Sequence, residues 1–542
     1  MVFSKRQAAC LVAVFFAILL NFREVSSFVA CDFGLAGTWG GHGFCTGGEY
    51  LDAPREMLRS NIRDEGDLYF VTGNRDGSLS SVERSLQLSF AWEAMPKPVV
   101  YGSSEGVRDA DVVISGPRGT AAMKKLSAEV RGSNRYDCVA EQGGCGLWMR
   151  RKDGASLARM DFAENHLPLE WWREGVGVIV VLAVLTVLFV MVDSASLSEM
   201  HPVACGLVVS YAVFVALLTL SHTFLPPNGL GVYGGRAKLL WLCRGLPAGF
   251  WNAPPWATLQ PTYPPGLVLL TLASYSVSGG CGEWLVQIIG MWGIVALFAC
   301  LLARCRSLIA GLWVSSLFLL PVVLRMGTQF YAEPFAILCC LLGWERVRGG
   351  ADSLSGWAMI GLSGFFRPEA VVVLPLAWTT TRIVCGQMAA SFAGLVAGLV
   401  PSAGWAICCM ACGAAAPGLR SLSAPALGQA CAALVAVLDS MFVHAWRTGF
   451  AWWFAVAAVA AVVSRRLRRS DFRDGRRSVV AALLCIGLVL LLCASFAWRN
   501  EPEFDWLLRT SVPRLIWLPT MLAAREVLDL MQKERMVDNH VR

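Results

Sequence analysis

The stretch PVACGLVVSYAVFVALLTLSHTFLPPNGLGVYGGRAKLL, residues 202–240, holds the pattern that decides the fold. Its first part, residues 203–224, is an apolar run long enough to cross a bilayer as an α-helix. Prolines and glycines then end the run, and residues 225–240 carry Arg236 and Lys238 but no carboxylate. Because only helices or closed barrels satisfy the backbone inside a bilayer, this alternation of apolar runs and loops predicts a helical membrane protein.

Composition extends this prediction to most of the chain. Of 542 residues, 56% are hydrophobic and 16% are charged, with a mean hydropathy of +0.54, whereas about a quarter of the residues of a soluble domain are charged. The expected fold class is mainly α, a polytopic transmembrane helical bundle of about 11 to 13 spans, with 355–383 open to a break. Beyond an N-terminal anchor, the predicted spans lie near 175–192, 203–224, 264–279, 284–303, 307–324, 328–344, 355–383, 388–411, 449–464, 479–497 and 512–524.

The chain is expected to divide into four regions. Lys5 and Arg6 precede an apolar run, which is typical of a signal anchor that sends the next segment outward. That next segment is the one polar region, and it is expected to form a small exported α/β domain. The predicted boundaries are 1–27 for the anchor and first span, 28–172 for the exported domain, 173–525 for the transmembrane domain with its outward loop 225–263, and 526–542 for the C-terminal tail.

Within the exported region, short runs bounded by turn residues predict strands, and residues 80–95 have the apolar spacing of a helix. The order strand, helix, strand favours an α/β unit. An Asp-Gly pair predicts a hairpin over 149–159. The expected strands cover 67–73, 97–102 and 109–116.

Four of the 19 cysteines lie in the polar region, and most of the others lie in apolar runs where a thiol acts as a small hydrophobe. Cys31 and Cys45 enclose one short Gly-containing segment, and Cys138 and Cys145 enclose another. We expect two local disulfides, which require an oxidising compartment. Four free thiols or a metal site remain the alternatives.

Basic residues set the expected orientation. The cluster RRLRRSDFRDGRR, residues 465–477, lies between two apolar runs, so the positive-inside rule explains it better than nucleic-acid binding does. The loops 303–306 and 345–350 have the same basic character. Simple alternation of the predicted spans cannot place every basic loop inside, and a broken or half-length helix between 264 and 330 would resolve the conflict.

The loop 225–263 offers cations at the outer surface. A short helix over 234–244, stopped by prolines on both sides, would place Arg236 and Arg244 on one face at the headgroup level. A guanidinium there can bind a lipid phosphate with two hydrogen bonds. Ordinary anchoring of a cationic amphipathic helix to anionic headgroups is the alternative.

Two carboxylates stand in apolar surroundings, where a charge is costly and usually paired or functional. These are Glu333 and Glu369, next to Pro334 and Pro368, which free backbone groups to face a cavity. Glu333 has no partner nearby in the sequence and is a candidate general base, metal ligand or proton-coupling residue. Glu369 can be neutralised by Arg367.

The order of several short motifs resembles the GT-C superfamily of polytopic glycosyltransferases, which includes aminoarabinose transferase-like and protein mannosyltransferase-like enzymes. The resemblance covers about residues 175–525. Its motifs are the loop residues Asn228, Tyr233, Arg236, Ala237 and Lys238, the span entry Tyr263-Pro264-Pro265, the element Tyr331-Ala332-Glu333-Pro334, FFRPEA with Arg367 and Glu369, and DWLLRTSVPRL at 505–515.

The resemblance implies transfer of a sugar from a polyprenyl-phosphate carrier to an envelope acceptor, by a hexosyl- or pentosyltransferase. In the family an acid of the first large outward loop is usually the base, but the loop 225–263 has no Asp or Glu, and Asn228 stands at the expected position. Either Glu333 or the exported domain supplies the base, or the alignment is displaced, or activity has been lost. The expected catalytic residues are Glu333 and Glu369, and the expected substrate-binding residues are Asn228, Tyr233, Arg236, Lys238, Arg244, Tyr263, Tyr331 and Arg367.

Two other functions stay open: a transporter or flippase for a lipid-linked saccharide, and an inactive GT-C-like scaffold. The expected partners are a polyprenyl-phosphate-linked sugar and membrane lipids, without nucleic acid. The sequence identifies no cofactor and leaves a divalent cation open. The expected location is the bacterial inner membrane, with the site facing the periplasm.

Overall fold

The computed structural model describes five short strands between residues 69 and 150 and most of the chain from 202 to 414. The described residues are 69–72, 99–102, 112–115, 136–142, 145–150, 202–220, 232–243, 250–251, 259–278, 281, 283–305, 308–349, 354–368, 370, 373–385, 392–414, 435, 514, 517–525 and 528. The predicted anchor, the helix 80–95, the spans 175–192, 449–464 and 479–497, and the basic cluster 465–477 lie outside them.

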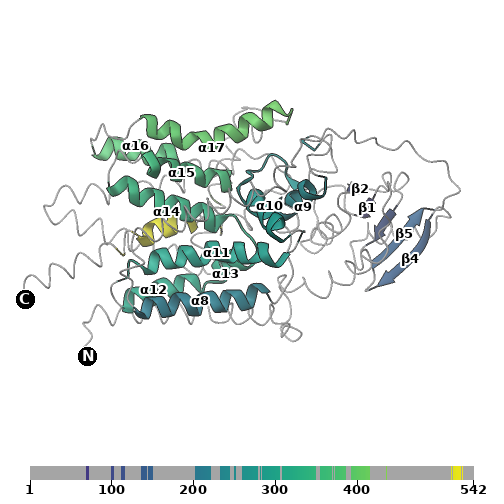
Figure 1. The fold of residues 1–542 in the computed structure, drawn as a ribbon, viewed down its shortest axis with the longest axis horizontal. Helices are drawn as coiled ribbons and strands as arrows, with labels where there is room; N and C mark the ends of the chain where they lie inside the picture. The colour runs from purple at the N-terminus through teal and green to yellow at the C-terminus, as the bar shows by residue number, and fades with distance from the viewer. Residues whose placement is uncertain are drawn as a thin grey trace, which may run out of the picture.

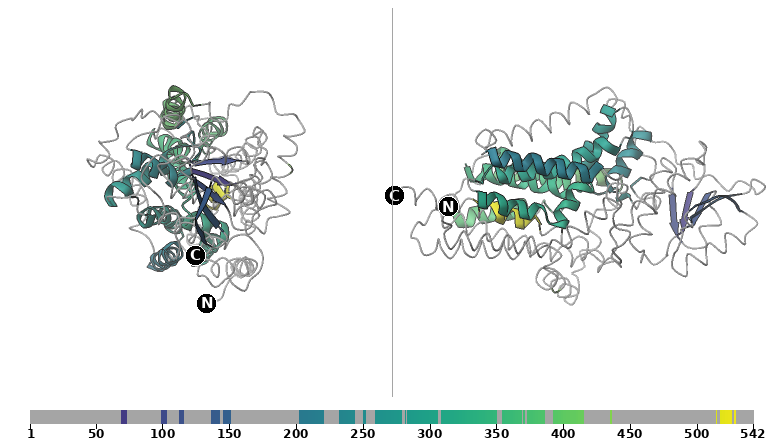
Figure 2. Two further views of the ribbon diagram at one scale, coloured as in Figure 1. Left: turned by 90° about the vertical axis from the view of Figure 1, so that its right-hand side faces the viewer. Right: turned by 90° about the horizontal axis from the view of Figure 1, so that it is seen from below.

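The described part after residue 200 is helical, as the apolar runs predicted (Figure 1). Most of its helices run side by side, and α9 and α10 lie at one end, which is called the α9 end below (Figures 1 and 2). The helices are α8 (Pro202–Leu220), α9 (Gly234–Cys243), α10 (Gly266–Ser278), α11 (Glu283–Leu302), α12 (Leu308–Phe318), α13 (Pro321–Thr328), α14 (Glu333–Gly349), α15 (Leu354–Phe366), α16 (Val373–Cys385) and α17 (Phe392–Ala411).

Three of the described helices are long and apolar enough to cross a membrane. These spans are Pro202–Thr219 of α8, Leu285–Leu302 of α11 and Phe392–Ala411 of α17. In α11, 67% of the span is buried inside the protein, against 17% in α17. Helix α11 is therefore central, and α17 presents an apolar outer face of the kind that contacts lipid.

Small residues allow the helices to approach closely. A Cβ on Gly361 of α15 would lie 1.8 Å from the carbonyl oxygen of Gly398 on α17, and a Cβ on Gly343 of α14 would lie 2.7 Å from that of Gly356 on α15. Contacts of this type are common between helices in membranes, where packing replaces the hydrophobic effect as the driving force.

Prolines divide two of the predicted spans. The single span predicted at 307–324 was wrong, because α12 ends at Phe318 and Pro321 begins the separate helix α13. Proline has no N–H to donate and is favoured in the first turn of a helix. The break allowed within 355–383 is confirmed, since α15 ends at Phe366 and Arg367 precedes Pro368.

Helix α10 does not cross the bundle. Its 13 residues rise about 20 Å, less than the about 30 Å of a bilayer's hydrocarbon core. Gly266 at its start packs on Phe365 and Phe366 at the end of α15, and Tyr275 near its end contacts Trp241 of α9, with ring centroids 6.3 Å apart. Both ends of α10 therefore lie at the α9 end, so the span predicted at 264–279 was wrong, and α10 is a half-length helix of the kind that would resolve the conflict among the basic loops.

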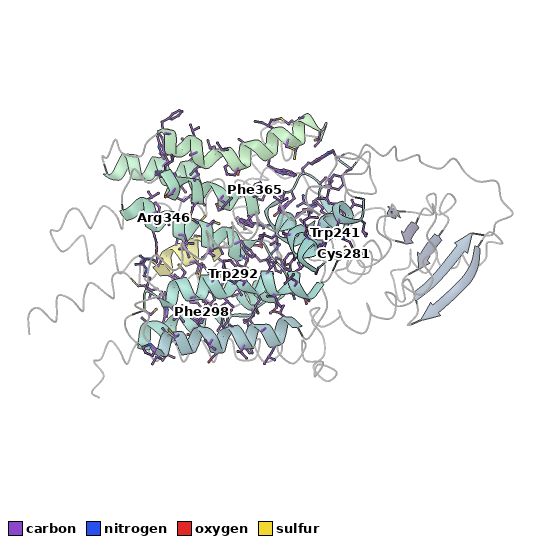
Figure 3. All side chains as sticks on the ribbon, viewed as in Figure 1. Trp241, Cys281, Trp292, Phe298, Arg346 and Phe365 are labelled. Carbon is purple, nitrogen blue, oxygen red and sulfur yellow. The ribbon has the colours of Figure 1, made fainter. Side chains whose placement is uncertain are left out.

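With α10 confined to one end, the basic loops after α11 and α14 meet at the opposite end. Arg304 Nη2 and Glu345 Oε2 form an ion pair at 2.7 Å. Figure 3 shows Arg346 at this end, away from Trp241 and Cys281. We call it the Glu345 end.

The strands form one five-stranded mixed sheet in the order β2-β1-β3-β5-β4. Strands β1 (Tyr69–Thr72), β2 (Val99–Gly102) and β3 (Val112–Ser115) confirm the predicted strand positions and pair in parallel. The observed hairpin, however, joins β4 (Tyr136–Gln142) to β5 (Cys145–Arg150). Residues 149 and 150 therefore lie at the end of β5 and pair with the preceding strand β4, instead of starting a hairpin over 149–159.

The hairpin register separates the second predicted cysteine pair. Cys138 stands opposite Trp148, and Cys145 stands opposite Gln142. The two cysteines are therefore four positions apart along the ladder, about 13 Å at the strand rise, whereas a disulfide joins Cα atoms up to about 7 Å apart. A Cys138–Cys145 disulfide does not fit this register, and the pair Cys31–Cys45 lies outside the described residues.

Candidate anion-binding site

The candidate site forms around Glu333, the first residue of α14. This carboxylate is buried, with 3% of the residue exposed. Its Oε1 lies 3.2 Å from Arg367 Nη2 and 3.1 Å from Arg514 Nη1. Glu333, which has no partner nearby in the sequence, is thus held by two guanidinium groups from distant parts of the chain.

Two tyrosines complete the surroundings of these arginines. The hydroxyl of Tyr263 accepts a hydrogen bond from Arg367 Nη1, and the Arg367 guanidinium carbon lies 5.6 Å from the centroid of that ring. The guanidinium carbon of Arg514 lies 4.8 Å from the centroid of Tyr331. Aromatic faces attract cations at such distances, so both rings orient the arginines without neutralising them.

Backbone strain marks the approach to the site. Phe330, which precedes Tyr331, has a φ of 56° and is 2% exposed. This left-handed conformation costs about 1–3 kcal/mol for a residue other than glycine. Gly290 on α11 makes room for the Phe330 ring, because a Cβ there would lie 2.8 Å from it. Close packing therefore imposes a conformation that turns the chain sharply into α14.

Arg236 has a different role from the one predicted. It is buried, with 2% exposed, and its guanidinium donates to four backbone carbonyl oxygens, those of Val232 at 2.6 Å, Pro261 at 3.1 Å, Tyr263 at 2.7 Å and Pro264 at 3.0 Å. Burial lowers its pKa to about 10, so it stays charged at neutral pH. The predicted surface position of Arg236 was wrong, because the residue is buried and holds the chain around Tyr263, while its binding of a substrate stays a prediction.

The other predicted residues divide into two groups. Tyr233 joins the aromatic wall, with its ring edge-on to Tyr263 at 5.9 Å, while Lys238 lies half-buried on α9 outside the cluster. The remaining three, Asn228, Arg244 and Glu369, lie outside the described residues. The structure thus brings together the predicted Tyr233, Tyr263, Tyr331, Glu333 and Arg367.

Arg514 is the member of the site that the sequence did not single out. It lies in DWLLRTSVPRL, which has two arginines and no feature that indicates which one turns inward. Its partner Glu333 is 181 positions away. The resemblance drew attention to this segment, but only packing identifies the residue.

Within the described residues the cluster joins one carboxylate, that of Glu333, to two guanidinium groups, those of Arg367 and Arg514. Exposure of the side chains rises from 3% for Glu333 to 9% for Arg367 and 16% for Arg514. Arg guanidinium groups bind oxyanions with directed hydrogen bonds. The cluster can therefore hold an anionic group, with Arg514 its most accessible member.

Metal ligands do not gather in the part of the chain that the structure describes, where no group of three or more His, Cys, Asp or Glu side chains is placed to hold an ion.

No protein-family model, curated protein or solved structure matches this chain.

Proposed function

We propose that the protein is a membrane glycosyltransferase that takes a sugar from a polyprenyl-phosphate carrier. The observation that carries this proposal is the convergence of Arg367 and Arg514 on one oxygen of the buried Glu333. Guanidinium groups bind phosphate oxygens with directed hydrogen bonds, and Arg514 is the more exposed of the two arginines. The tyrosine rings beside them suit the sugar or the lipid next to that phosphate.

The proposed layout is a GT-C-like bundle with an exported α/β domain over 28–172 and the α9 end facing the periplasm of a bacterial inner membrane. The basic loops near Arg304 and Arg346 support this orientation, because they lie at the opposite end (Figure 3). The strands lie beyond the α9 end (Figures 1 and 2), on the side where an exported domain would be expected.

In this proposal the arginines carry the electrostatic part of the reaction. Sugar transfer breaks the bond between the anomeric carbon and the phosphate oxygen, and the leaving phosphate gains negative charge that Arg367 and Arg514 stabilise. Glu333 holds both guanidinium groups in place, which leaves it poorly suited to accept a proton from the acceptor. The base then falls to Glu369, the other predicted carboxylate, or to the exported domain.

A second candidate function is binding of the lipid carrier without turnover, as part of an envelope assembly. Two observations favour it: the one carboxylate described in the site is paired with two arginines, and the loop 225–263 contains no Asp or Glu. Binding and turnover therefore have to be measured separately.

The experiment uses purified protein in lipid nanodiscs and a panel of radiolabelled polyprenyl-phosphate sugars, with binding and loss of the sugar followed together. We expect Arg367→Gln and Arg514→Gln to weaken binding by about tenfold or more, since hydrogen bonds to charged groups contribute about 1.5–3 kcal/mol. The control is Arg346→Gln at the Glu345 end, which should bind as the wild type does.

Three outcomes separate the candidates. Binding with release of the sugar supports a transferase, and binding without release over the whole panel supports the carrier-binding function. Movement of the intact lipid-linked sugar between leaflets supports a flippase. No binding to the wild-type protein would contradict all three.

A further inference from the structure

A second ionic cluster lies near the far end of α14. Glu345 Oε2 lies 2.7 Å from Arg304 Nη2, and Glu345 Oε1 lies 2.5 Å from Arg525 Nε. The side chain of Arg525 is 6% exposed and that of Glu345 is 10% exposed, while Arg304 is 26% exposed. The pair between Glu345 and Arg525 is therefore the more deeply buried one.

The spacing of the two clusters matches along two segments of the chain. Glu333 and Glu345 are twelve residues apart on α14, and Arg514 and Arg525 are eleven residues apart. Twelve residues of α-helix rise about 18 Å, and eleven rise about 16 Å. We name residues 514, 517–525 and 528 the C-terminal strap. The strap runs alongside α14 in the same direction, as the yellow segment in Figure 1 shows.

The strap is packed into the bundle as well as ion-paired. Residues 517–525 are helical, and Trp517 is 1% exposed and Met521 is 0% exposed. Its other buried residues are Pro519, Thr520, Leu522, Ala523, Ala524, Arg525 and Leu528. Because closely packed interiors transmit strain, a change at one end of the strap affects the placement of the other.

We propose that Glu345 and Arg525 are positioning residues for Arg514: their ion pair fixes the strap against α14 and so places the Arg514 guanidinium at the candidate site about 18 Å away. Arg514 is the most exposed of the three charged groups there, and it belongs to a segment that packs into the bundle and forms these two ion pairs with α14. What the site binds rests on the proposed function, whereas the docking of the strap does not.

The experiment compares two variants that each remove one of the arginines on Glu345. Arg525→Gln removes the ion pair between the strap and Glu345 and leaves Glu345 paired with Arg304. Arg304→Gln removes the other arginine and leaves the strap anchored. Both are made in the full chain in lipid nanodiscs. One readout is hydrogen–deuterium exchange in peptides covering 514–525, and the other is the affinity for a polyprenyl phosphate.

We expect Arg525→Gln to speed amide exchange in the strap and to weaken phosphate binding about tenfold, the change that ~1.4 kcal/mol of coupling produces. Arg304→Gln should leave both readouts within about twofold of the wild type. Arg525→Lys, which keeps the charge beside Glu345, should recover most of the affinity. A purely structural role would instead lower thermal stability in both variants and leave the affinity of the folded protein unchanged.

Two results would overturn the inference: equal effects of the two variants on strap exchange, or faster strap exchange in Arg525→Gln with unchanged phosphate affinity. If the wild-type protein binds no phosphate, the proposed function fails, and the exchange readout alone decides the docking of the strap. Faster exchange near residue 514 in Arg525→Gln would then still support the positioning role.

Discussion

The two ends of α14 have the same charges and different surroundings. Glu333 and Glu345 each contact two arginines, but the two on Glu345 take separate carboxylate oxygens, whereas both on Glu333 reach Oε1. Among the described residues, the Glu333 cluster has aromatic rings, those of Tyr263 and Tyr331, against its arginines. It also has a residue with a left-handed backbone, Phe330, at its edge. Paired charges alone therefore do not identify a binding site; their surroundings do.

The number of carboxylate oxygens that the arginines contact indicates a different role for Glu333 and for Glu345. At the Glu345 end each oxygen has its own cation, so the pairing suits a fixed structural link. At the Glu333 end both arginines reach one oxygen, and Arg514, the more exposed of the two, is the more accessible to an added anion. The four predictions below separate these roles, and the first has the largest expected effect.

Glu345→Gln is expected to lower the free energy of unfolding by about 3–5 kcal/mol, because it leaves the buried Arg525 without its carboxylate. Thermal unfolding in lipid nanodiscs measures this. Glu333→Gln should also destabilise the protein, but a bound polyprenyl phosphate should recover part of the loss by neutralising the arginines. If polyprenyl phosphate restored the stability of Glu345→Gln as much as that of Glu333→Gln, the two ends of α14 would not differ in anion binding.

Gly343→Ala and Gly290→Ala test the packing near each end. A Cβ on Gly343 meets the carbonyl oxygen of Gly356 at 2.7 Å, and backbone cannot move aside, so a loss of about 1–3 kcal/mol is expected. A Cβ on Gly290 meets the Phe330 ring at 2.8 Å, so this variant should shift the site and weaken phosphate binding more than it lowers stability. Gly404→Ala, with nothing within 4 Å of its Cβ, is the control.

Tyr263→Phe removes the hydroxyl that accepts a hydrogen bond from Arg367. Since one such bond contributes about 0.5–1.5 kcal/mol, phosphate affinity should fall about two- to tenfold. Tyr211→Phe is the matched control: it removes a buried bond to the carbonyl oxygen of Phe318 at 3.2 Å, far from the site. It should lower stability and leave affinity unchanged, and a loss of affinity in both would point to general loosening of the bundle.

Thiol labelling tests which end of α14 faces outward. An impermeant maleimide added outside sealed cells should modify Cys281, at the α9 end, and spare Cys205, near the start of α8. Burial raises the pKa of Cys281 to about 11, so the labelling rate should rise about tenfold per pH unit between pH 7 and 9 as the thiolate fraction grows. Labelling of Cys205 instead of Cys281, mapped by mass spectrometry, would reverse the proposed orientation.

Several features followed from the sequence because they depend on local chemistry. Apolar runs of span length predicted the helices, and the flanking prolines predicted the short helix α9 (Gly234–Cys243), while the break within 355–383 was allowed without a position. The conflict among basic loops indicated that a broken or half-length helix between 264 and 330 would resolve it. The buried Glu333 was singled out because a lone carboxylate in an apolar run requires a partner or a function.

Only the tertiary structure decided which groups meet. Glu333 pairs with Arg514, which is 181 positions away in the sequence, and with Arg367, which is 34 positions away. No local sequence pattern encodes either pairing. Arg236, whose sequence context favoured an exposed phosphate ligand, is buried because four carbonyl oxygens converge on it. Burial and partnership depend on how distant helices pack, so the sequence determined that the chain forms apolar helices, and packing determined which charges face each other.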